Sequence, residues 1–147
     1  MQVKRLKAHK YLGMALDYST VGQVKITMLD YIDGIFGSFD KSDPTGGGAK
    51  SSTAPAVIFN VDEGCKKLST KVSVDFHCLV EKILFATKWD RPDTCIKISF
   101  LTMRGREPDN DNWSNFVYLM KYIIGTRNLP LILSSNRSVI IKWWIDG

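Results

Sequence analysis

The sequence predicts an α+β protein, and three observations support this class. Residues 11–19 and 22–27 alternate apolar and polar side chains with the period of a β-strand. A central stretch carries apolar residues at helical spacing, and residues 129–134 and 139–146 return to strand composition. Strands at both ends of a run of helices favour α+β over an alternating α/β fold.

The first elements are a predicted β-hairpin and a helix. Leu12, Met14 and Leu16 share one face of the first strand, and a short link around Val21 leads into the second. Residues 28–39 then predict a short amphipathic helix, because Thr27 can cap its N-terminus and apolar residues recur at helical spacing. These apolar residues are Met28, Ile32, Ile35, Phe36 and Phe39.

Residues 40–56 change to Gly, Ser, Thr, Lys and Pro. Such a segment buries too little apolar surface to offset its ordering entropy, so we expect a mobile loop. A phosphate-binding loop is the functional alternative, but no Gly-Lys-[Ser/Thr] opens a helix after an apolar strand here.

Residues 57–128 predict three helices that pack as a bundle. Ser69 or Thr70 caps the first helix. Its apolar stripe comprises Val72, Phe76, Leu79, Val80, Ile83 and Leu84. The second helix begins at residues 91–93, and its expected buried face consists of Ile96, Phe100 and Met103.

Pro108 ends the second helix, and Asn110 or Asp111 caps the third. The third helix closes at Gly125. Its expected buried residues are Trp113, Phe116, Val117, Met120 and Ile123.

Residues 129–147 predict a C-terminal β-hairpin. Its second strand, residues 139–146, is apolar on both faces, as strands inside a sheet are. We therefore expect neighbouring strands beyond residue 147 and regard the chain as a piece of a larger protein.

The net charge of +5 is unevenly placed. Four basic and no acidic side chains fall in residues 1–10, three basic and seven acidic ones in residues 11–65, and thirteen basic and eight acidic ones in residues 66–147. This distribution permits a polyanionic partner, but on charge alone a solvated basic surface without a partner is favoured.

Cys65, Cys78 and Cys95 match no zinc-ligand spacing, so we expect reduced, buried thiols in an intracellular protein. The sequence shows no signal peptide and no apolar run long enough to cross a bilayer. We therefore expect an intracellular protein without a membrane partner.

The ionisable residues form no evident catalytic set. His9 and His77 have no defensible Ser or Cys partner. Asp146 differs, because it ends a predicted central strand, but a single carboxylate holds Mg²⁺ poorly. The remaining candidate acids stand at predicted helix starts and are interpreted as capping residues: Asp30, Asp93, Asp109 and Asp111.

Several segments carry motifs in a fixed order. They are HKYLGM (residues 9–14), KITMLDYI (25–32), FHCLVEKILFATKWDRPD (76–93), EPDNDNW (107–113), LMKYIIGTRNLPLIL (119–133) and IIKWWID (140–146). Taken together they resemble the reverse transcriptase region of Ty1/copia-type retrotransposon Pol polyproteins. In this resemblance the first segment is similar to the strand that ends the polymerase palm, and the last is similar to the first strand of RNase H.

The resemblance implies a domain organisation. Residues 1–27 would end the polymerase palm, residues 28–39 would form a thumb helix, residues 40–56 the loop, residues 57–128 the helical thumb and connection, and residues 129–147 the truncated start of an RNase H-like domain. The family enzyme is an RNA-directed DNA polymerase that uses Mg²⁺.

The family's catalytic Tyr-x-Asp-Asp motif is absent from these 147 residues. Asp146 would be the first RNase H-type catalytic aspartate, and it would bind metal only with the rest of that domain present. We therefore expect no cofactor in this fragment and no activity from the chain alone.

The resemblance also implies partners, namely an RNA/DNA hybrid or primer-template and the rest of the Pol polyprotein, and it implies a location in the cytoplasm or nucleus. Basic residues would neutralise backbone phosphates without recognising sequence. The candidate nucleic-acid-binding residues are Lys10, Tyr11, Gly13, Lys25, Arg91, Arg104, Arg106, Lys121 and Arg127.

Each candidate has a structural alternative. The basic residues could be solvated surface charges, and Tyr11 and Gly13 could be ordinary strand residues. Arg91 could instead pair with Asp93 or with a helix carboxyl terminus. Tryptophans at positions 113, 143 and 144 could stack on bases, although core packing is favoured for Trp113.

Three functions remain open from the sequence. The first is a reverse transcriptase fragment that grips primer-template. The second is a free-standing basic module that binds nucleic acid by charge and shape. The third is a degenerate retroelement remnant with no activity.

Overall fold

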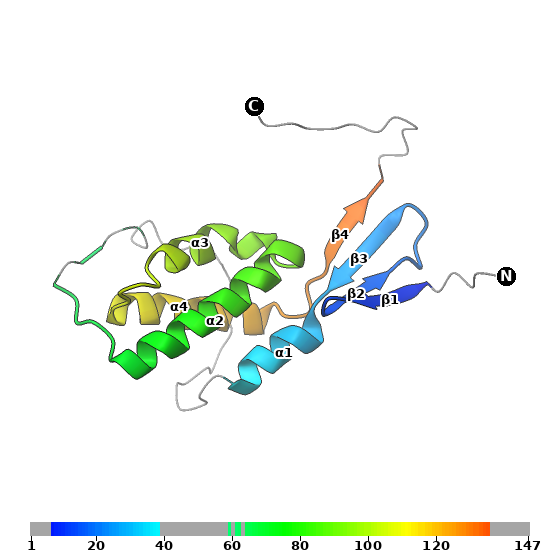
Figure 1. Ribbon diagram of the computed structural model, residues 1–147. Coiled ribbons are helices and arrows are strands. Elements are labelled where there is room, and N and C mark those ends of the chain that lie inside the picture. Colours follow the sequence, from blue (N-terminus) through cyan, green and yellow to red (C-terminus); the bar gives the residue numbers. More distant parts are fainter. Residues whose placement is uncertain (1–6, 39–58, 60, 63, 136–147) are drawn as a thin grey trace.

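The computed structural model describes residues 7–38, 59, 61–62 and 64–135, which form an α+β fold as predicted. Helices gather at one end of the described part and a sheet lies at the other (Figure 1). The elements in chain order are β1 (Ala8–Tyr11), β2 (Met14–Asp17), β3 (Gln23–Thr27), α1 (Leu29–Ser38), α2 (Thr70–Trp89), the short 3₁₀ helix η2 (Pro92–Thr94), α3 (Cys95–Met103), α4 (Asn110–Gly125) and β4 (Leu131–Ser134).

The predicted N-terminal hairpin is present as β2 and β3, which pair antiparallel with Leu16 opposite Ile26. The predicted start of its first strand is wrong. Leu12 and Gly13 form a two-residue turn, so the chain before them makes a further antiparallel strand, β1, with Tyr11 opposite Met14. A glycine in a two-residue link favours such a turn, and this signal was available in the sequence.

β4 joins the N-terminal sheet, which the sequence did not predict. The strand order is β1-β2-β3-β4, and β4 pairs antiparallel with β3, with Ile26 opposite Leu131. Residues 129–134 were expected to pair with residues 139–146 at the start of a separate domain. Residues 139–146 lie outside the described residues, as does the predicted loop 40–56.

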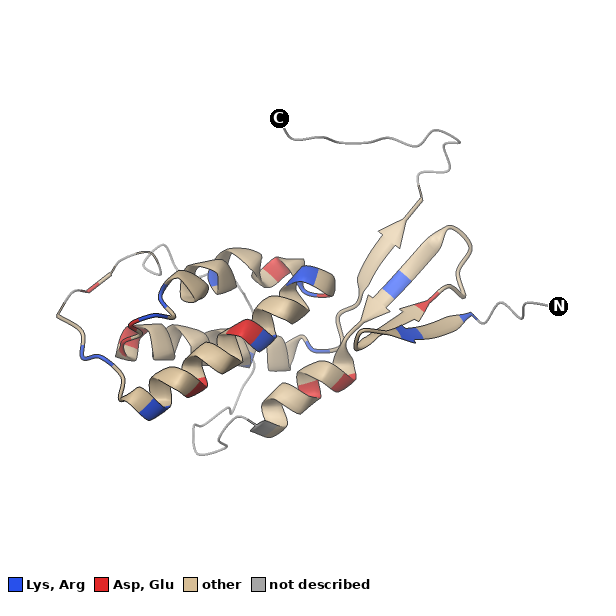
Figure 2. Cartoon of the chain, viewed as in Figure 1, with Lys and Arg blue, Asp and Glu red and all other residues tan. Residues whose placement is uncertain are grey.

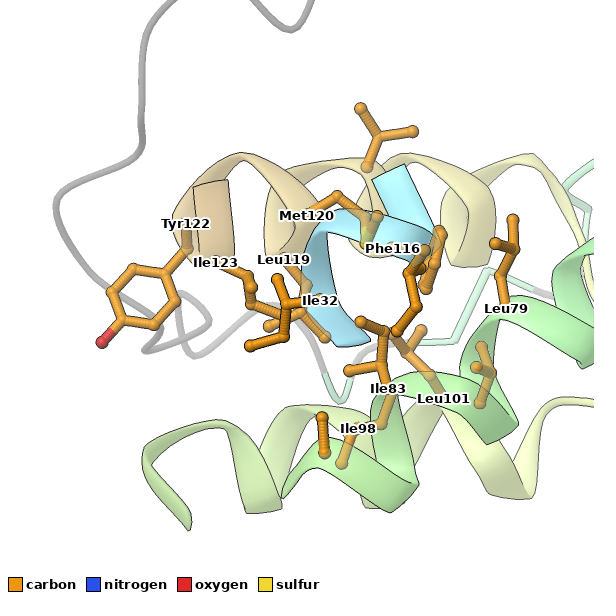
Figure 3. Close-up of a cluster of buried hydrophobic side chains, with 14 of the residues drawn as sticks. Ile32, Leu79, Ile83, Ile98, Leu101, Phe116, Leu119, Met120, Tyr122 and Ile123 are labelled. Carbon is orange, nitrogen blue, oxygen red and sulfur yellow. The ribbon is translucent and has the colours of Figure 1, made fainter. Parts of the chain in front are cut away.

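One continuous apolar core joins the sheet to the helices. Met14 and Ile26 reach it from the sheet, and side chains from α1, α2, α3 and α4 point toward one another around it (Figure 3). The predicted stripes of α1, α2 and α4 supply most of this core. Their fully buried members include Ile32, Phe76, Val80, Ile83, Phe116, Met120 and Ile123.

The face that α3 buries differs from the prediction. Phe100 is buried as expected, but Ile96 and Met103 are 73% and 74% exposed, and Lys97 is 2% exposed in their place. α3 is apolar nearly all round, with Ile98 and Leu101 also buried, so helical spacing alone could not identify its inner face.

The caps of two helices also differ in detail. Asp109, one of the acids interpreted as capping residues, caps α4 in place of Asn110 or Asp111. Its carboxylate accepts from the Asn112 N–H at 2.9 Å, and the Asn112 side chain accepts from the Asp109 N–H. Ser69 precedes α2 as expected but makes no side-chain cap hydrogen bond.

Candidate nucleic-acid interface

An open groove of about 730 Å³ lies between the β1–β2 turn and the first turn of α1. Lys10, Tyr11 and Gly13 line it from the turn, and Asp30 and Tyr31 line it from the helix. Three of the nine nucleic-acid candidates from the sequence therefore lie together at one place.

The turn has left-handed backbone at both central residues, with φ of 49° at Leu12 and 80° at Gly13. Positive φ at both positions matches the tight hairpin turns that follow the natural strand twist. The space beside Gly13 would hold a Cβ, since Met28 Cε and Tyr31 Cβ would lie 3.6 and 3.8 Å away. Backbone conformation, not lack of room, is therefore what favours glycine here.

The side chains of the turn are exposed. Tyr11 is 62% exposed and Leu12 is 56% exposed. Lys10 forms an ion pair with Asp30, with 3.0 Å between Nζ and Oδ2, and both side chains remain mostly in solvent. An exposed pair of this kind contributes at most about 1 kcal/mol, so a phosphate can compete for the lysine.

Lys25 lies on β3, on the side of the sheet opposite the core, since its neighbours Val24 and Ile26 face the core cluster. Asp17 is its cross-strand partner. Hydrogen bonds from Ser19 lower the pKa of Asp17, and the charges of Lys25 and Lys7 lower it further. The sheet surface around Lys25 therefore carries both signs of charge.

The remaining surface candidates do not converge on the groove. Arg127 pairs with Asp33 of α1 at 3.4 Å, and Arg104 pairs with the cap residue Asp109 at 3.4 Å. Arg106 is exposed beyond α3. Basic positions occur in both the helical end and the sheet end, and α1 carries acidic ones (Figure 2).

Lys121 lies with Trp113, Val117 and Tyr118 along a shallow groove of about 310 Å³ on α4. Trp113 is partly buried against Phe76 and Phe116, with ring centroids 6.3 and 6.1 Å apart. The core-packing interpretation of Trp113 is therefore confirmed.

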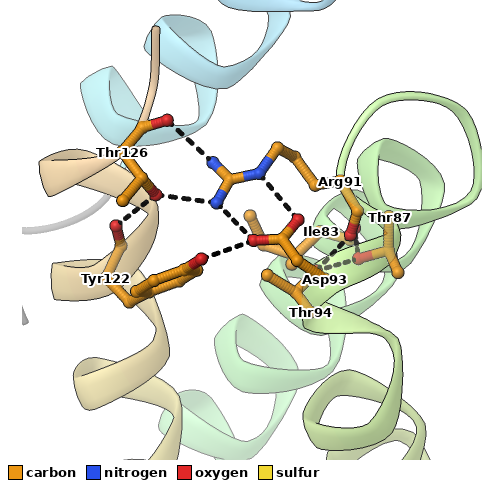
Figure 4. A network of polar contacts seen from close by, with 7 residues as sticks. All are labelled: Ile83, Thr87, Arg91, Asp93, Thr94, Tyr122 and Thr126. Atoms are coloured by element: carbon orange, nitrogen blue, oxygen red, sulfur yellow. Dashed lines mark hydrogen bonds and ion pairs between the residues drawn. The ribbon is translucent and has the colours of Figure 1, made fainter. Parts of the chain in front are cut away.

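Arg91 is not a surface residue, and its assignment as a phosphate contact is wrong. It is 2% exposed. Its Nε and Nη2 donate to the two carboxylate oxygens of Asp93 at 3.0 and 2.8 Å, and Nη1 and Nη2 donate to the carbonyl and hydroxyl of Thr126 at 3.3 and 2.7 Å (Figure 4). The structural alternative, pairing with Asp93 and a helix carboxyl terminus, is what the structure shows.

Tyr122 completes this network. Its hydroxyl donates to Asp93 at 2.7 Å, and the Arg91 guanidinium lies 5.3 Å from its ring centre (Figure 4). Burial acts on Asp93 to raise its pKa, but the bonds from Arg91 and Tyr122 outweigh it and leave that pKa lowered. The network fixes the end of α2 to the end of α4.

Two buried charged residues were missed by the sequence analysis. Asp90 is 3% exposed, and its Oδ2 accepts from the backbone N–H of Met28 at 2.9 Å. Lys97 stacks over the Tyr118 ring with Nζ 4.0 Å from the centroid, and its Nζ has no hydrogen-bond partner. Burial lowers the pKa of Lys97 to about 8. No local sequence pattern marks either residue, because both depend on contacts distant in the chain.

Within the described ranges, no group of three His, Cys, Asp or Glu side chains is placed to hold a metal ion. Asp146, with Trp143 and Trp144, lies outside the described residues. The expectation of buried thiols is wrong, since Cys78 and Cys95 are exposed and Cys65 is partly exposed. In the same part of the chain, no helix is both long and apolar enough to span a bilayer.

Comparison with known proteins gave no match to a protein family, to a curated protein or to a solved structure.

Proposed function

We propose that this chain is a part of a Ty1/copia-type reverse transcriptase and that it holds primer-template in the groove between the β1–β2 turn and α1. The ordered motifs of the sequence suggest the family. The observation that carries the proposal is the turn, which gathers Lys10, Tyr11 and Gly13 beside one groove.

The chemistry of the groove suits a nucleic-acid backbone. Lys10 supplies a positive charge for a phosphate, and exposed Tyr11 offers a flat ring to a sugar or base. Gly13 permits the left-handed backbone of the turn that places Lys10 and Tyr11 beside the groove. None of these contacts distinguishes one base from another, so the grip is independent of sequence.

The proposal assigns positioning, not catalysis, to this chain. The Tyr-x-Asp-Asp motif would be supplied by other parts of the polymerase, together with its Mg²⁺ ions. The rest of the Pol polyprotein is therefore a partner, and the nucleic acid is an RNA/DNA hybrid or a DNA primer on RNA.

The test uses fluorescence anisotropy with a labelled RNA/DNA hybrid that has a recessed 3′ end. Lys10→Ala and Tyr11→Ala should each weaken binding about 3- to 10-fold, the range expected for one phosphate or one stacking contact. Lys71→Ala and Tyr18→Ala are the matched controls, because both residues are exposed and neither lines the groove.

Equal losses in the groove variants and the controls would contradict the groove assignment. Preference among nucleic acids distinguishes this proposal from a free-standing basic module. A module that binds by charge alone should bind single strands, duplex DNA and hybrid with similar salt dependence. A grip should favour the hybrid with a recessed end. A cooperative melt without any binding at low salt would reject both.

A further inference from the structure

Met28, which lies beside the β1–β2 turn, is hydrogen-bonded to Asp90 at the C-terminal end of α2. Met28 is the single residue between β3 and α1, is fully buried, and has its side chain under Gly13. Its carbonyl accepts from the Ile32 N–H at 2.9 Å and so begins α1. Its own N–H lies before the helix and, with no access to water, needs another acceptor.

Asp90 supplies that acceptor from 62 residues away in sequence. It caps the C-terminus of α2, where its own N–H donates to the Ala86 carbonyl at 2.9 Å. Its Oδ2 accepts from the Met28 N–H at 2.9 Å, while its Oδ1 makes no hydrogen bond. Burial raises the pKa of Asp90, although the Met28 N–H, the charge of Arg91 and the backbone N–H of Leu131 act in the opposite direction.

A second contact fixes the same helical turn. The Tyr31 hydroxyl donates to the Lys82 carbonyl of α2 at 3.2 Å, and the Tyr31 ring lies 5.4 Å from that of Phe85. Tyr31 and Met28 are the two side chains nearest to Gly13. The C-terminal part of α2 and its cap therefore contact both residues that lie next to Gly13, Met28 through its backbone N–H and Tyr31 through its side chain.

We infer that Asp90 is a positioning residue for the groove, because its hydrogen bond to Met28 sets where the first turn of α1 lies beneath Gly13. The nature of the ligand in this inference rests on the proposed function. The role of Asp90 in setting the geometry of the groove does not. Arg91 and Asp93, next to it, serve a different purpose, since they bind the end of α4.

The experiment compares three variants of the full chain for binding to the recessed RNA/DNA hybrid. Asp90→Ala removes the acceptor and should weaken binding about tenfold, because the first turn of α1 is then no longer held in the binding geometry and must be ordered when the ligand binds. Asp90→Asn keeps an oxygen acceptor and should stay within about threefold of the wild type. Tyr122→Phe removes the nearby hydroxyl that donates to Asp93 and should leave binding unchanged.

The Tyr122→Phe control separates positioning from general loss of stability, because it alters the neighbouring network without contacting Met28. Wild-type binding by Asp90→Ala, or an equal loss in Tyr122→Phe, would overturn the inference. If Asp90→Ala does not melt cooperatively, Asp90→Gln replaces it, since the longer side chain moves the acceptor away from Met28.

Amide hydrogen exchange, measured without nucleic acid, keeps this inference apart from the proposed function. Exchange at Met14 and Met28 should accelerate in Asp90→Ala and not in Tyr122→Phe. If the wild type binds no hybrid, the proposed function fails. The exchange rates alone then decide whether Asp90 positions the groove. Equal exchange at these amides in the two variants would overturn the positioning of the groove by Asp90.

Discussion

Arg91 is the largest side chain that the described residues bury completely. A buried cation is costly unless its donors are satisfied, and here Asp93 and Thr126 take them. The same local sequence, Arg-Pro-Asp, suggested both a phosphate contact and an ion pair. Only the folded contact with Thr126, 35 residues away, decides between them.

Replacing Arg91 tests this interpretation. Arg91→Ala should lower the free energy of unfolding by about 3 kcal/mol, because it removes the cation that pairs with Asp93 and the two hydrogen bonds to Thr126, even though Tyr122 still donates to Asp93 and Leu129 to the Thr126 carbonyl. Arg106→Ala, at an exposed arginine, should change it by less than about 0.5 kcal/mol. Urea melts of both variants measure the difference. Similar losses would contradict the burial of Arg91.

The burial of Lys97 predicts how the stability of the protein depends on pH. Its pKa falls from 10.5 to about 8 on folding because of burial, so the unfolded chain holds the proton more tightly. Stability should therefore rise as pH increases from about 8 toward 10.5, and the cost of the buried charge is present in full below pH 8.

Lys97→Met should stabilise the protein at pH 7 by about 1–3 kcal/mol and remove this part of the rise. Paired urea melts at pH 7 and pH 9.5 check the prediction, with Lys71→Met as the exposed control. A Lys97→Met variant that is less stable than wild type at pH 7 would show that the charge is satisfied.

At the scale of elements, helical periodicity predicted the buried face of a helix where that helix carries a single apolar stripe. α2 and α4 each have one such stripe, and the structure buries it. α3 has apolar residues around most of its surface, so its buried face depended on the neighbours that it meets. The pairing of β4 with β3 spans more than 100 residues, and no local pattern encodes such a partner.

The turn and the helix that line the groove each contain a glycine whose replacement tests the local backbone geometry. Gly13→Ala should destabilise the protein by about 1–2 kcal/mol, because φ is 80° there. Gly34→Ala, in α1, should stabilise it by about 0.5–1 kcal/mol, because the new methyl group would lie within 4 Å of no atom other than those of its own helix backbone and chain neighbours. Thermal melts of both variants are the measurement, and Gly13→Asn should fall between Gly13→Ala and wild type. A neutral Gly13→Ala would contradict the turn geometry.

At the scale of the whole molecule, the sheet and the helices are joined by contacts at the C-terminal end of α2. Asp90 contacts the β3–α1 junction, and Arg91 contacts the end of α4. β4 then returns the chain from α4 to the N-terminal sheet. The sequence therefore predicted most of the elements and three of the residues that line the groove, while these joining contacts required the fold.

Truncation tests whether β4 belongs to this unit. A chain that ends at Asn128 lacks β4, whereas one that ends at Ser135 keeps it. The shorter chain should be less stable by about 3 kcal/mol, because β3 loses its ladder partner and Leu131 leaves the core. Equal urea melts of the two truncated chains would place β4 outside the folding unit.

The most direct test of the central claim is a backbone amide map of hybrid binding by NMR. Addition of the recessed RNA/DNA hybrid at low salt should shift the amides of Lys10 to Met14 and of Asp30 and Tyr31, and leave those near Lys71 and Arg106 unchanged. Shifts confined to α3 and α4, or no shifts from a folded chain, would contradict a nucleic-acid grip in the groove.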